Sequence, residues 1–262
     1  NAQALGWMIQ LMFLLVGWHY AKQGFGVLMV LSSRRGVRFS AWERHVILAY
    51  SYAAWAFAWA NPAHAAGEFE EKGVVYWAPA VAHGFELAAG SVLALATVAL
   101  AVVLSRKLRR ERQLPWAPLS AFLITIWLLT IYTTLDPLLR YVIPALHSIQ
   151  YLYFVRLMKR NQALAHEGPP SFGPPAATRV TMLALSALAL GWVLFHGAPW
   201  LLDATFASAF RAQHATLGFT PCFAALYALV NIHHYFMDAA IWRREHAETR
   251  YLTESDGAAV SR

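Results

Sequence analysis

Four apolar stretches of this chain each carry a histidine beside polar or acidic residues at helical spacing. Residues three or four apart lie on one face of a helix, so the members of each group could act together. Ionisable side chains inside apolar helices are costly and mark functional sites by default. The groups are His19 with Gln23, His83 with Glu86, His147 with Gln150 and Tyr151, and Asn231, His234 and Asp238 on one face with His233 about 100° away.

Histidines from four helices could bind a single metal ion inside a helical bundle. Neutral imidazoles suit iron, copper, zinc or manganese, and an iron site that uses oxygen leaves coordination positions open. We therefore predict a metal site formed by His19, His83, His147 and one of His233 or His234.

Polar side chains near these histidines are the candidate supporting and catalytic groups. Glu86, Asp238 and Gln150 could accept the ring N–H that does not face the metal and so orient the ring. Tyr151 and Tyr235 could contact the metal or a substrate. A lone histidine in a membrane span can instead be a hydrogen-bonded packing residue, but four buried imidazoles would each need a partner. The candidate catalytic residues are Tyr151, Asp238 and Glu86.

The other histidines and the single cysteine are weaker candidates. His196 and His214 flank the outer ends of the last two apolar stretches, near Asp203, and could form a second, outward-facing site. Cys222 cannot form an internal disulfide, and the chain has no cysteine spacing typical of a thiolate metal site. The histidines expected in loops are His45, His64, His166 and His246.

The composition indicates a membrane protein. The 262 residues are 58% hydrophobic and only 13% charged, and the mean hydropathy is +0.41. Soluble globular proteins carry about 25% charged residues, so this chain lacks the charge of an aqueous surface. An ordinary soluble enzyme and a disordered chain are both excluded.

Seven apolar stretches are long enough to be membrane spans, and each must be helical because lipid cannot satisfy the backbone of an isolated strand. The sequence therefore predicts an all-α, polytopic helical bundle that forms a single transmembrane domain. A linker at 159–179 and a polar tail at 243–262 complete it. The predicted spans run approximately from Ala2 to Leu31, His45 to Ala60, Val75 to Leu104, Leu119 to Leu135, Leu138 to Leu157, Val180 to Phe195 and Ala215 to Trp242.

The basic residues predict the orientation of these spans. Of 21 Lys and Arg, 17 lie in four segments between or after the apolar stretches. This clustering follows the positive-inside rule and does not form the basic face of a nucleic-acid-binding protein. Seven spans then place the N-terminus outside and the C-terminus in the cytoplasm, in a multi-pass protein of the inner membrane. The four segments are 32–44, 105–113, 156–179 and the residues after Trp242.

The same histidine motifs resemble those of the bacterial membrane carotenoid dioxygenases of the Brp/Blh type, which make retinal from β-carotene. The similar elements are His19 with Gln23, AHGFE at His83, HSIQYLYFVR from His147, and His233 followed five residues later by Asp238. Tyr151 stands where the family motif has a second histidine. The resemblance implies a non-heme iron oxygenase scaffold, with Fe(II) as the cofactor.

Several functions fit these observations. The first is an oxidoreductase in which Fe(II) activates oxygen against a lipophilic substrate such as a carotenoid, an isoprenoid or an acyl chain. The second is a b-type haem or pigment-binding subunit of an electron-transfer complex. This function needs a pair of ligands such as His19 and His147, and it implies partner subunits. A zinc-dependent membrane hydrolase with Asp238 or Glu86 as base is a third. A transporter with an ion or proton path along Lys22, Asp238 and Glu86 is a fourth. Membrane lipids are expected contacts in every case.

Overall fold

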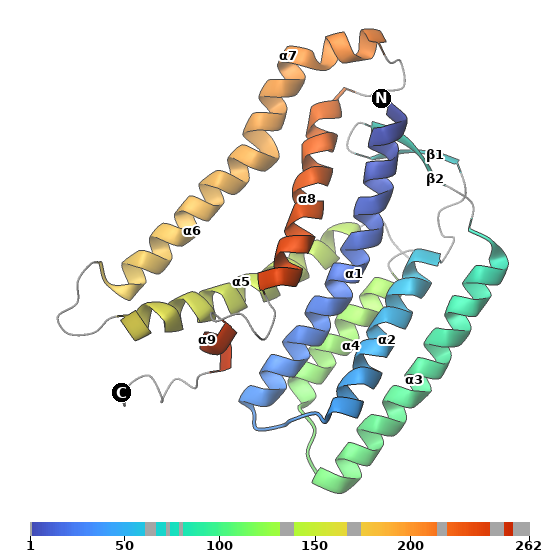
Figure 1. The fold of residues 1–262 in the computed structure, drawn as a ribbon, viewed down its shortest axis with the longest axis vertical. Coiled ribbons are helices and arrows are strands. Elements are labelled where there is room, and N and C mark those ends of the chain that lie inside the picture. Colours follow the sequence, from blue (N-terminus) through green and yellow to red (C-terminus); the bar gives the residue numbers. More distant parts are fainter. Residues whose placement is uncertain are drawn as a thin grey trace. The chain divides into compact units, whose positions relative to one another are not determined.

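The chain is built from helices and one small β-hairpin (Figure 1). The computed structural model describes residues 2–60, 67–71, 74–78, 81–131, 139–166, 174–213, 219–241 and 249–253. The predicted all-α class is confirmed, because only the hairpin departs from helix among the described elements. In chain order these are α1 (Ala2–Arg34), α2 (Ala41–Ala60), β1 (Gly67–Glu71), β2 (Val74–Ala78), α3 (His83–Glu111), α4 (Trp116–Ile131), α5 (Leu139–His166), α6 (Ala176–Trp192), the π-helix η1 (Val193–Gly197), α7 (Ala198–Gln213), α8 (Pro221–Ile241) and α9 (Arg250–Thr253).

The chain divides into two compact units, which are described separately. Two of the boundaries between the units fall inside helices, one in α1 and one in α5, so each of these helices contributes residues to both units. Unit 1 comprises Asn1–Val16, Ala66–Pro79 and Arg156–Arg262, and unit 2 comprises Gly17–Ala65 and Ala80–Val155.

Unit 2 is organised around α2, which packs against both α3 and α4 (Figure 1). The second half of α1 joins the same core through Leu28, which has no exposed surface. Close van der Waals packing of this kind is what holds helices together in an apolar medium. The buried core side chains are Leu28, Phe39, Ile47, Ala54, Leu100, Leu114, Leu119, Phe122 and Ile126.

A glycine allows α1 and α2 to approach closely. Gly17 is buried, and a Cβ atom at this position would lie 2.6 Å from Cδ1 of Trp55. Small residues at helix interfaces allow this kind of close approach. Gly17 therefore fixes the spacing of the two helices two residues before His19.

A network of charges connects the α1–α2 loop of unit 2 to the end of α3. Ser40 and Glu43 form a capping box at the start of α2, in which each backbone N–H is bonded by the other side chain, at 2.8 and 3.3 Å. Lys107 is fully buried, donates to the carbonyl oxygen of Arg38 at 2.7 Å, and lies 3.5 Å from the Glu43 carboxylate. Lys107 also donates to Glu111 at 2.7 Å. These partners offset the cost of burying the Lys107 charge.

In unit 1, α6 continues through η1 into α7, and α8 contacts both η1 and α7. The start of α8 is fastened by Asp203 of α7, whose two carboxylate oxygens accept the backbone N–H groups of Cys222 and Phe223 at 2.8 and 2.9 Å. A carboxylate at a helix N-terminus satisfies N–H groups that have no intrahelical acceptor. Asp203 is thus a helix cap, which differs from the predicted outward-facing site with His196; His214 lies outside the described residues.

The short helix α9 contacts the last turns of α5 in unit 1. Asn161 is buried and donates from Nδ2 to the carbonyl oxygen of Tyr251 at 2.7 Å. Arg179 of α6 donates to the carbonyl oxygen of Ala163 at 3.0 Å. The predicted linker at 159–179 is therefore helical at both ends, and the predicted polar tail contains a buried helical turn. Hydropathy predicts the end of an apolar stretch, whereas the end of a helix is set by its backbone hydrogen bonds. The two boundaries therefore differ at the linker and in the tail.

The hairpin changes where the third predicted span begins. β1 and β2 pair antiparallel, from Gly67 opposite Ala78 to Glu71 opposite Val74. The first residues of the predicted span from Val75 to Leu104 are therefore in a strand, and α3 begins only at His83. The alternation of the segment GEFEE and the β-branched pair in VVYWA favour strands over a helix. The region from Ala198 to Gln213, which the sequence did not assign to a span, is helical as α7.

Two helical segments of the described chain have the length and the apolar composition needed to cross a membrane. These are His83–Glu111 and Ala177–Ala212, the second of which runs through α6, η1 and α7. A shorter apolar helix covers Trp116–Leu128. These helices support membrane association at the level of length and composition.

Candidate metal site

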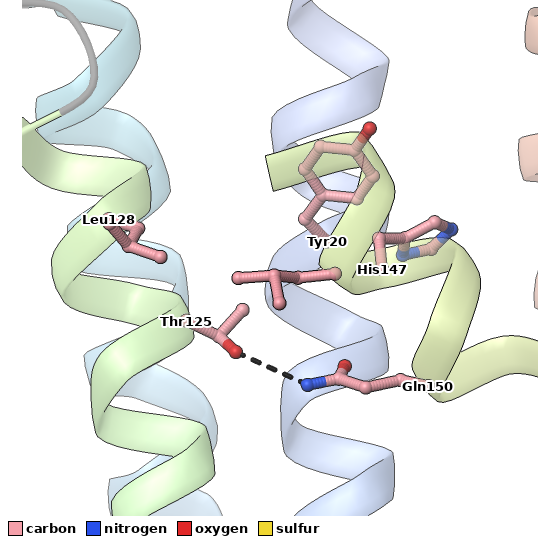
Figure 2. A pocket seen from close by; sticks show the side chains of 6 residues that line it. Tyr20, Thr125, Leu128, His147 and Gln150 are labelled. Carbon is pink, nitrogen blue, oxygen red and sulfur yellow. Dashed lines mark hydrogen bonds between the residues drawn. The ribbon is translucent and has the colours of Figure 1, made fainter. Parts of the chain in front are cut away.

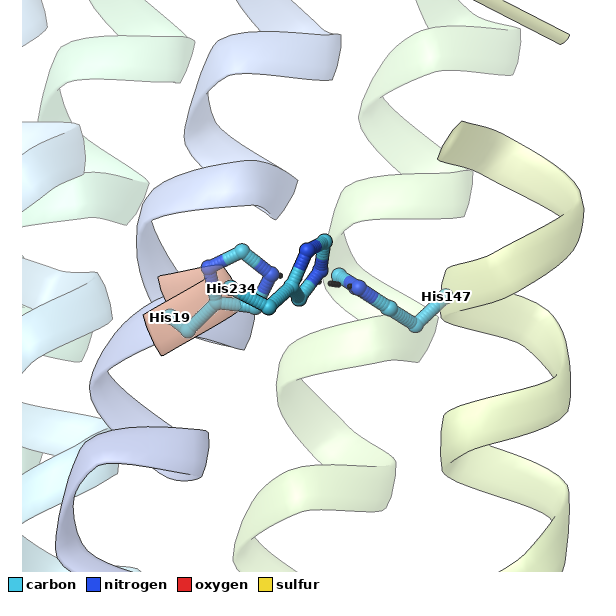
Figure 3. Close-up of side chains that lie close together, drawn as sticks. All are labelled: His19, His147 and His234. Atoms are coloured by element: carbon cyan, nitrogen blue, oxygen red, sulfur yellow. Dashed lines mark hydrogen bonds between the residues drawn. The ribbon is translucent and has the colours of Figure 1, made fainter. Parts of the chain in front are cut away.

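Two of the predicted ligands face each other in unit 2. The Nε2 atoms of His19 in α1 and His147 in α5 lie 3.1 Å apart (Figure 3). Their ring centroids are 4.7 Å apart, and the ring planes meet at 66°. The His19 side chain is only 5% exposed, and His147 is half-buried. Two histidines 128 residues apart therefore present ring nitrogens to one small region.

Gln23 connects the same two helices near this pair. Its Nε2 donates to the backbone carbonyl oxygen of His147 at 3.1 Å. The sequence placed Gln23 on the same face as His19, one turn further along the helix. In the structure its bond to the His147 backbone fixes the separation of α1 and α5 at the position of the pair.

Tyr20 is a third aromatic residue of this region, and helical spacing alone did not single it out. Its ring is buried, and its centroid lies 4.5 Å from that of His147. Tyr20 follows His19 directly, so on a helix the two side chains diverge by about 100°. The His147 ring lies close to both rings, and the signal that could have identified Tyr20 is this aromatic pair within WHYAKQ.

A small cavity lies next to His147 (Figure 2). Its volume is about 10 Å³, which is room for about one water-sized molecule. Gln150 closes one side, with its Nε2 3.5 Å from the hydroxyl oxygen of Thr125. The cavity accommodates a small molecule and excludes a long-chain substrate. Its lining residues are Tyr20, Thr125, Leu128, Leu146, His147 and Gln150.

In unit 1, α8 pairs a histidine with an acid. Nε2 of His234 lies 3.6 Å from Oδ2 of Asp238, whose side chain is 5% exposed. This distance is longer than a hydrogen bond, but it places the carboxylate beside one ring nitrogen. His233 is exposed. The resemblance aligned His233 with Asp238, whereas in the structure the i, i+4 neighbour His234 contacts this acid.

The structure places His83 and Glu86 at the start of α3, away from the interior of the helical bundle. His83 is the first residue of α3, its side chain is 78% exposed, and its Nδ1 lies 3.1 Å from Oε2 of Glu86. This differs from the predicted convergence with His19 and His147. The physical reason is the later start of α3: eight residues of expected helix, about 12 Å at 1.5 Å per residue, precede the observed start.

Tyr151 completes the set of predicted site residues. It lies one turn after His147 on α5 and is half-buried.

Comparisons of the chain with protein-family models, with curated proteins and with solved structures each find no match. The chemistry of the site is therefore argued from its own side chains and their distances.

Proposed function

We propose that the protein is a multi-pass membrane oxidoreductase with a histidine-ligated, non-heme Fe(II) site that acts on a lipophilic substrate. The observation that carries this proposal is the 3.1 Å separation of the Nε2 atoms of His19 and His147. Two nitrogens bound to one ion at about 2.0–2.1 Å lie about 2.9 to 3.4 Å apart when they subtend about 90° to 110°. The pair fits two adjacent positions in the coordination shell of one ion.

A third ligand would come from α8. We propose that His234 joins His19 and His147 in a group that could hold a metal ion. His234 belongs to unit 1 and the pair to unit 2, so the meeting of the three rings is itself proposed. With Nε2 of His234 beside Asp238, Nδ1 is the nitrogen that would bind the ion, and the carboxylate would orient the ring. Three histidines leave positions open, which is what oxygen-using iron sites require.

The same distance favours this site over a haem held by His19 and His147. Two histidines that held a haem between them would need room for the porphyrin between their rings. The two Nε2 atoms lie 3.1 Å apart, which leaves no room for a porphyrin. Zinc accepts the same ligands, so zinc and iron are separated by experiment.

The composition of the chain supports a lipophilic substrate. The chain is 58% hydrophobic, and two helices have the length and composition of membrane spans. With seven spans and cytoplasmic basic segments, a substrate would reach the protein from the bilayer. Carotenoids, isoprenoids and acyl chains are the matching class. Bound Fe(II) would supply oxygen activation, and the small cavity beside His147 would admit a molecule the size of oxygen or water.

Metal analysis of detergent-purified protein, with a visible absorption spectrum, tests the proposal. We expect close to one iron per chain and no Soret band, with metal lost in His19→Ala, His147→Ala and His234→Ala. His233→Ala is the matched control, since it removes the neighbouring, exposed histidine of the same helix and should retain the metal. Oxygen uptake on addition of a carotenoid or a fatty acid would then identify the substrate class.

Three results would contradict the proposal. A Soret band would indicate haem-based electron transfer, and stoichiometric zinc without iron would indicate a hydrolase. The absence of any bound metal, with no loss on substitution, would mean that His19 and His147 form a hydrogen bond that joins two helices.

A further inference from the structure

A second, larger cavity lies in unit 1 between α6, η1 and α8. It is an open groove of about 700 Å³, a volume within the range of small-molecule sites. Most of its lining is apolar, and its aromatic residues contact one another. The rings of Phe223 and Tyr227 are stacked with centroids 6.1 Å apart, and Phe195 packs edge-on against Tyr227 at the same distance.

One polar side chain of the groove comes from the π-helix, and the Tyr227 hydroxyl belongs to another lining residue. His196 lies in η1, which interrupts the helical run between α6 and α7. Single π-helical turns inside α-helices occur frequently at functional sites. Trp192 lies over the same turn, and a Cβ atom at Gly197 would lie 3.1 Å from its ring. The groove thus has an aromatic wall along its length and one imidazole at the η1 end.

The surroundings of the groove define its occupant. The helical run Ala177–Ala212 has the length and composition of a membrane span, and none of its most apolar window is buried inside the protein. A groove in such a surface opens to hydrocarbon, because apolar side chains on this scale face lipid. The occupant must be apolar and elongated, with one polar end that can hydrogen-bond to an imidazole.

We propose that this groove binds the hydrocarbon chain of a single-chain membrane amphiphile, with its hydroxyl or carboxyl end at His196. Aromatic side chains supply a large apolar contact surface. The imidazole can donate to or accept from the polar end, depending on its tautomer. This site is separate from the proposed metal site, and binding at it does not depend on a metal.

Photo-crosslinking with a diazirine-labelled palmitic acid in lipid nanodiscs tests this site. We expect labelled peptides from residues 187–196 and 223–227, and labelling that saturates and is competed by unlabelled palmitic acid. Bulk lipid contacts every outward face, so saturation separates a site from the bilayer. Labelling that rises linearly with probe concentration and is distributed evenly over all lipid-facing segments would overturn the proposal.

Gly191→Leu is the variant that fills the groove. Gly191 lines it, and a Cβ there meets nothing within 4 Å among the described residues, so the variant should fold. We expect at least about a fivefold loss of saturable labelling. Ser186→Leu is the matched control: Ser186 is exposed on the same helix and does not line the groove. Equal labelling of both variants at wild-type level would overturn the proposal.

His196→Phe tests the polar end separately. Hexadecanol should compete with the probe for labelling of the wild-type protein about three- to tenfold more strongly than hexadecane does. This ratio corresponds to one hydrogen bond. The variant keeps the apolar wall and should lose this preference while still being labelled. A preference that survives the substitution would place the polar end elsewhere and contradict the assigned orientation.

Discussion

Gln23 donates a hydrogen bond from Nε2 to the backbone carbonyl oxygen of His147, at 3.1 Å. This bond joins α1 to α5 one turn from the point where the Nε2 atoms of His19 and His147 meet. Polar side chains that hydrogen-bond across two helices help to hold them together. It therefore positions His147 through the backbone of that residue.

Replacing Gln23 should weaken metal binding without removing a ligand. Gln23→Leu takes away the donor, so α5 can shift relative to α1 and the two imidazoles lose their separation. Loss of such supporting contacts typically costs 10–100-fold in metal affinity, and we expect about tenfold. Titration of the apo-protein with Fe(II), followed by metal analysis, measures the change.

Gln10→Leu is the control for this experiment, because it removes another glutamine from α1. We expect it to keep the wild-type affinity. If Gln23→Leu binds metal as tightly as wild type, the bond to His147 has no part in organising the site.

Asp238 should act on metal retention through the His234 ring. The carboxylate lies beside Nε2 of His234 at 3.6 Å, and an anionic oxygen there orients the ring and raises its basicity as a ligand. Asp238→Asn keeps the shape and removes the charge, so we expect about a tenfold lower metal affinity. Equilibrium dialysis against a chelator of known affinity would measure it.

Asp203→Asn provides the contrast on the same unit. Asp203 accepts the N–H groups of Cys222 and Phe223 with its two carboxylate oxygens. The amide nitrogen of asparagine cannot accept the second N–H, so this variant should lower the free energy of unfolding by about 1 kcal/mol. The metal content per folded chain should be unchanged. A pattern in which both variants lose metal equally would indicate that Asp238 acts only through the stability of α8.

The sequence predicted the type of fold and part of the site, for reasons that can be traced to particular residues. Apolar length identified α2 and α8 closely, because in both helices the charged residues lie in the first or last turn. It missed the last nine residues of α5, since Arg156, Lys159 and Arg160 interrupt the apolar stretch inside that helix. It misplaced the start of α3, since VVYWA is as apolar as a span but lies in a hairpin. This error explains why His83 was expected inside a span, whereas it lies at the exposed start of α3.

Within the site, spacing predicted neighbours on one helix better than partners on two. Asp238 was expected to share a face with His234, and the two are in contact. The partner of Gln23 could not be predicted, because the side of α5 that faces α1 depends on tertiary packing. The contact of Tyr20 with His147 has the same origin. Short-range periodicity carries no information about the rotation of one helix relative to another.

The charge network at the end of α3 should make an unequal contribution to stability through its two acids. Glu43 is buried, lies 3.5 Å from the buried Lys107 ammonium, and is a member of the capping box with Ser40. Breaking a buried ion pair by removing one partner costs about 3–5 kcal/mol. Glu43→Ala should therefore destabilise the protein by about 3 kcal/mol.

The matched variant is Glu111→Ala, since Glu111 also pairs with Lys107 but is more than a third exposed. An exposed pair contributes about 0–1 kcal/mol, so this variant should be close to wild type. Thermal unfolding in detergent, monitored by circular dichroism, compares the two. Equal destabilisation would indicate that burial of Glu43 does not control the stability of this end of unit 2.

Two glycines of α1 should respond in opposite ways to the same substitution. A Cβ atom at Gly17 would lie 2.6 Å from Cδ1 of Trp55, a distance at which the ring or the helix must move. Over-packing of this kind typically costs about 1–3 kcal/mol, and we expect Gly17→Ala to fall in that range. At Gly26 a Cβ meets nothing within 4 Å among the described residues. Gly26→Ala should therefore be neutral or stabilising by about 0.5–1 kcal/mol, because alanine favours the helix.

Metal content distinguishes a general loss of packing from a local effect on the site. Gly17 precedes His19 by two residues, so a forced separation of α1 from α2 should also displace the His19 ring. We expect Gly17→Ala to lower both the melting temperature and the metal affinity, and Gly26→Ala to change neither unfavourably. If Gly17→Ala lowers stability but binds metal as tightly as wild type, the contact with Trp55 supports the bundle alone, and the position of His19 is set by α5.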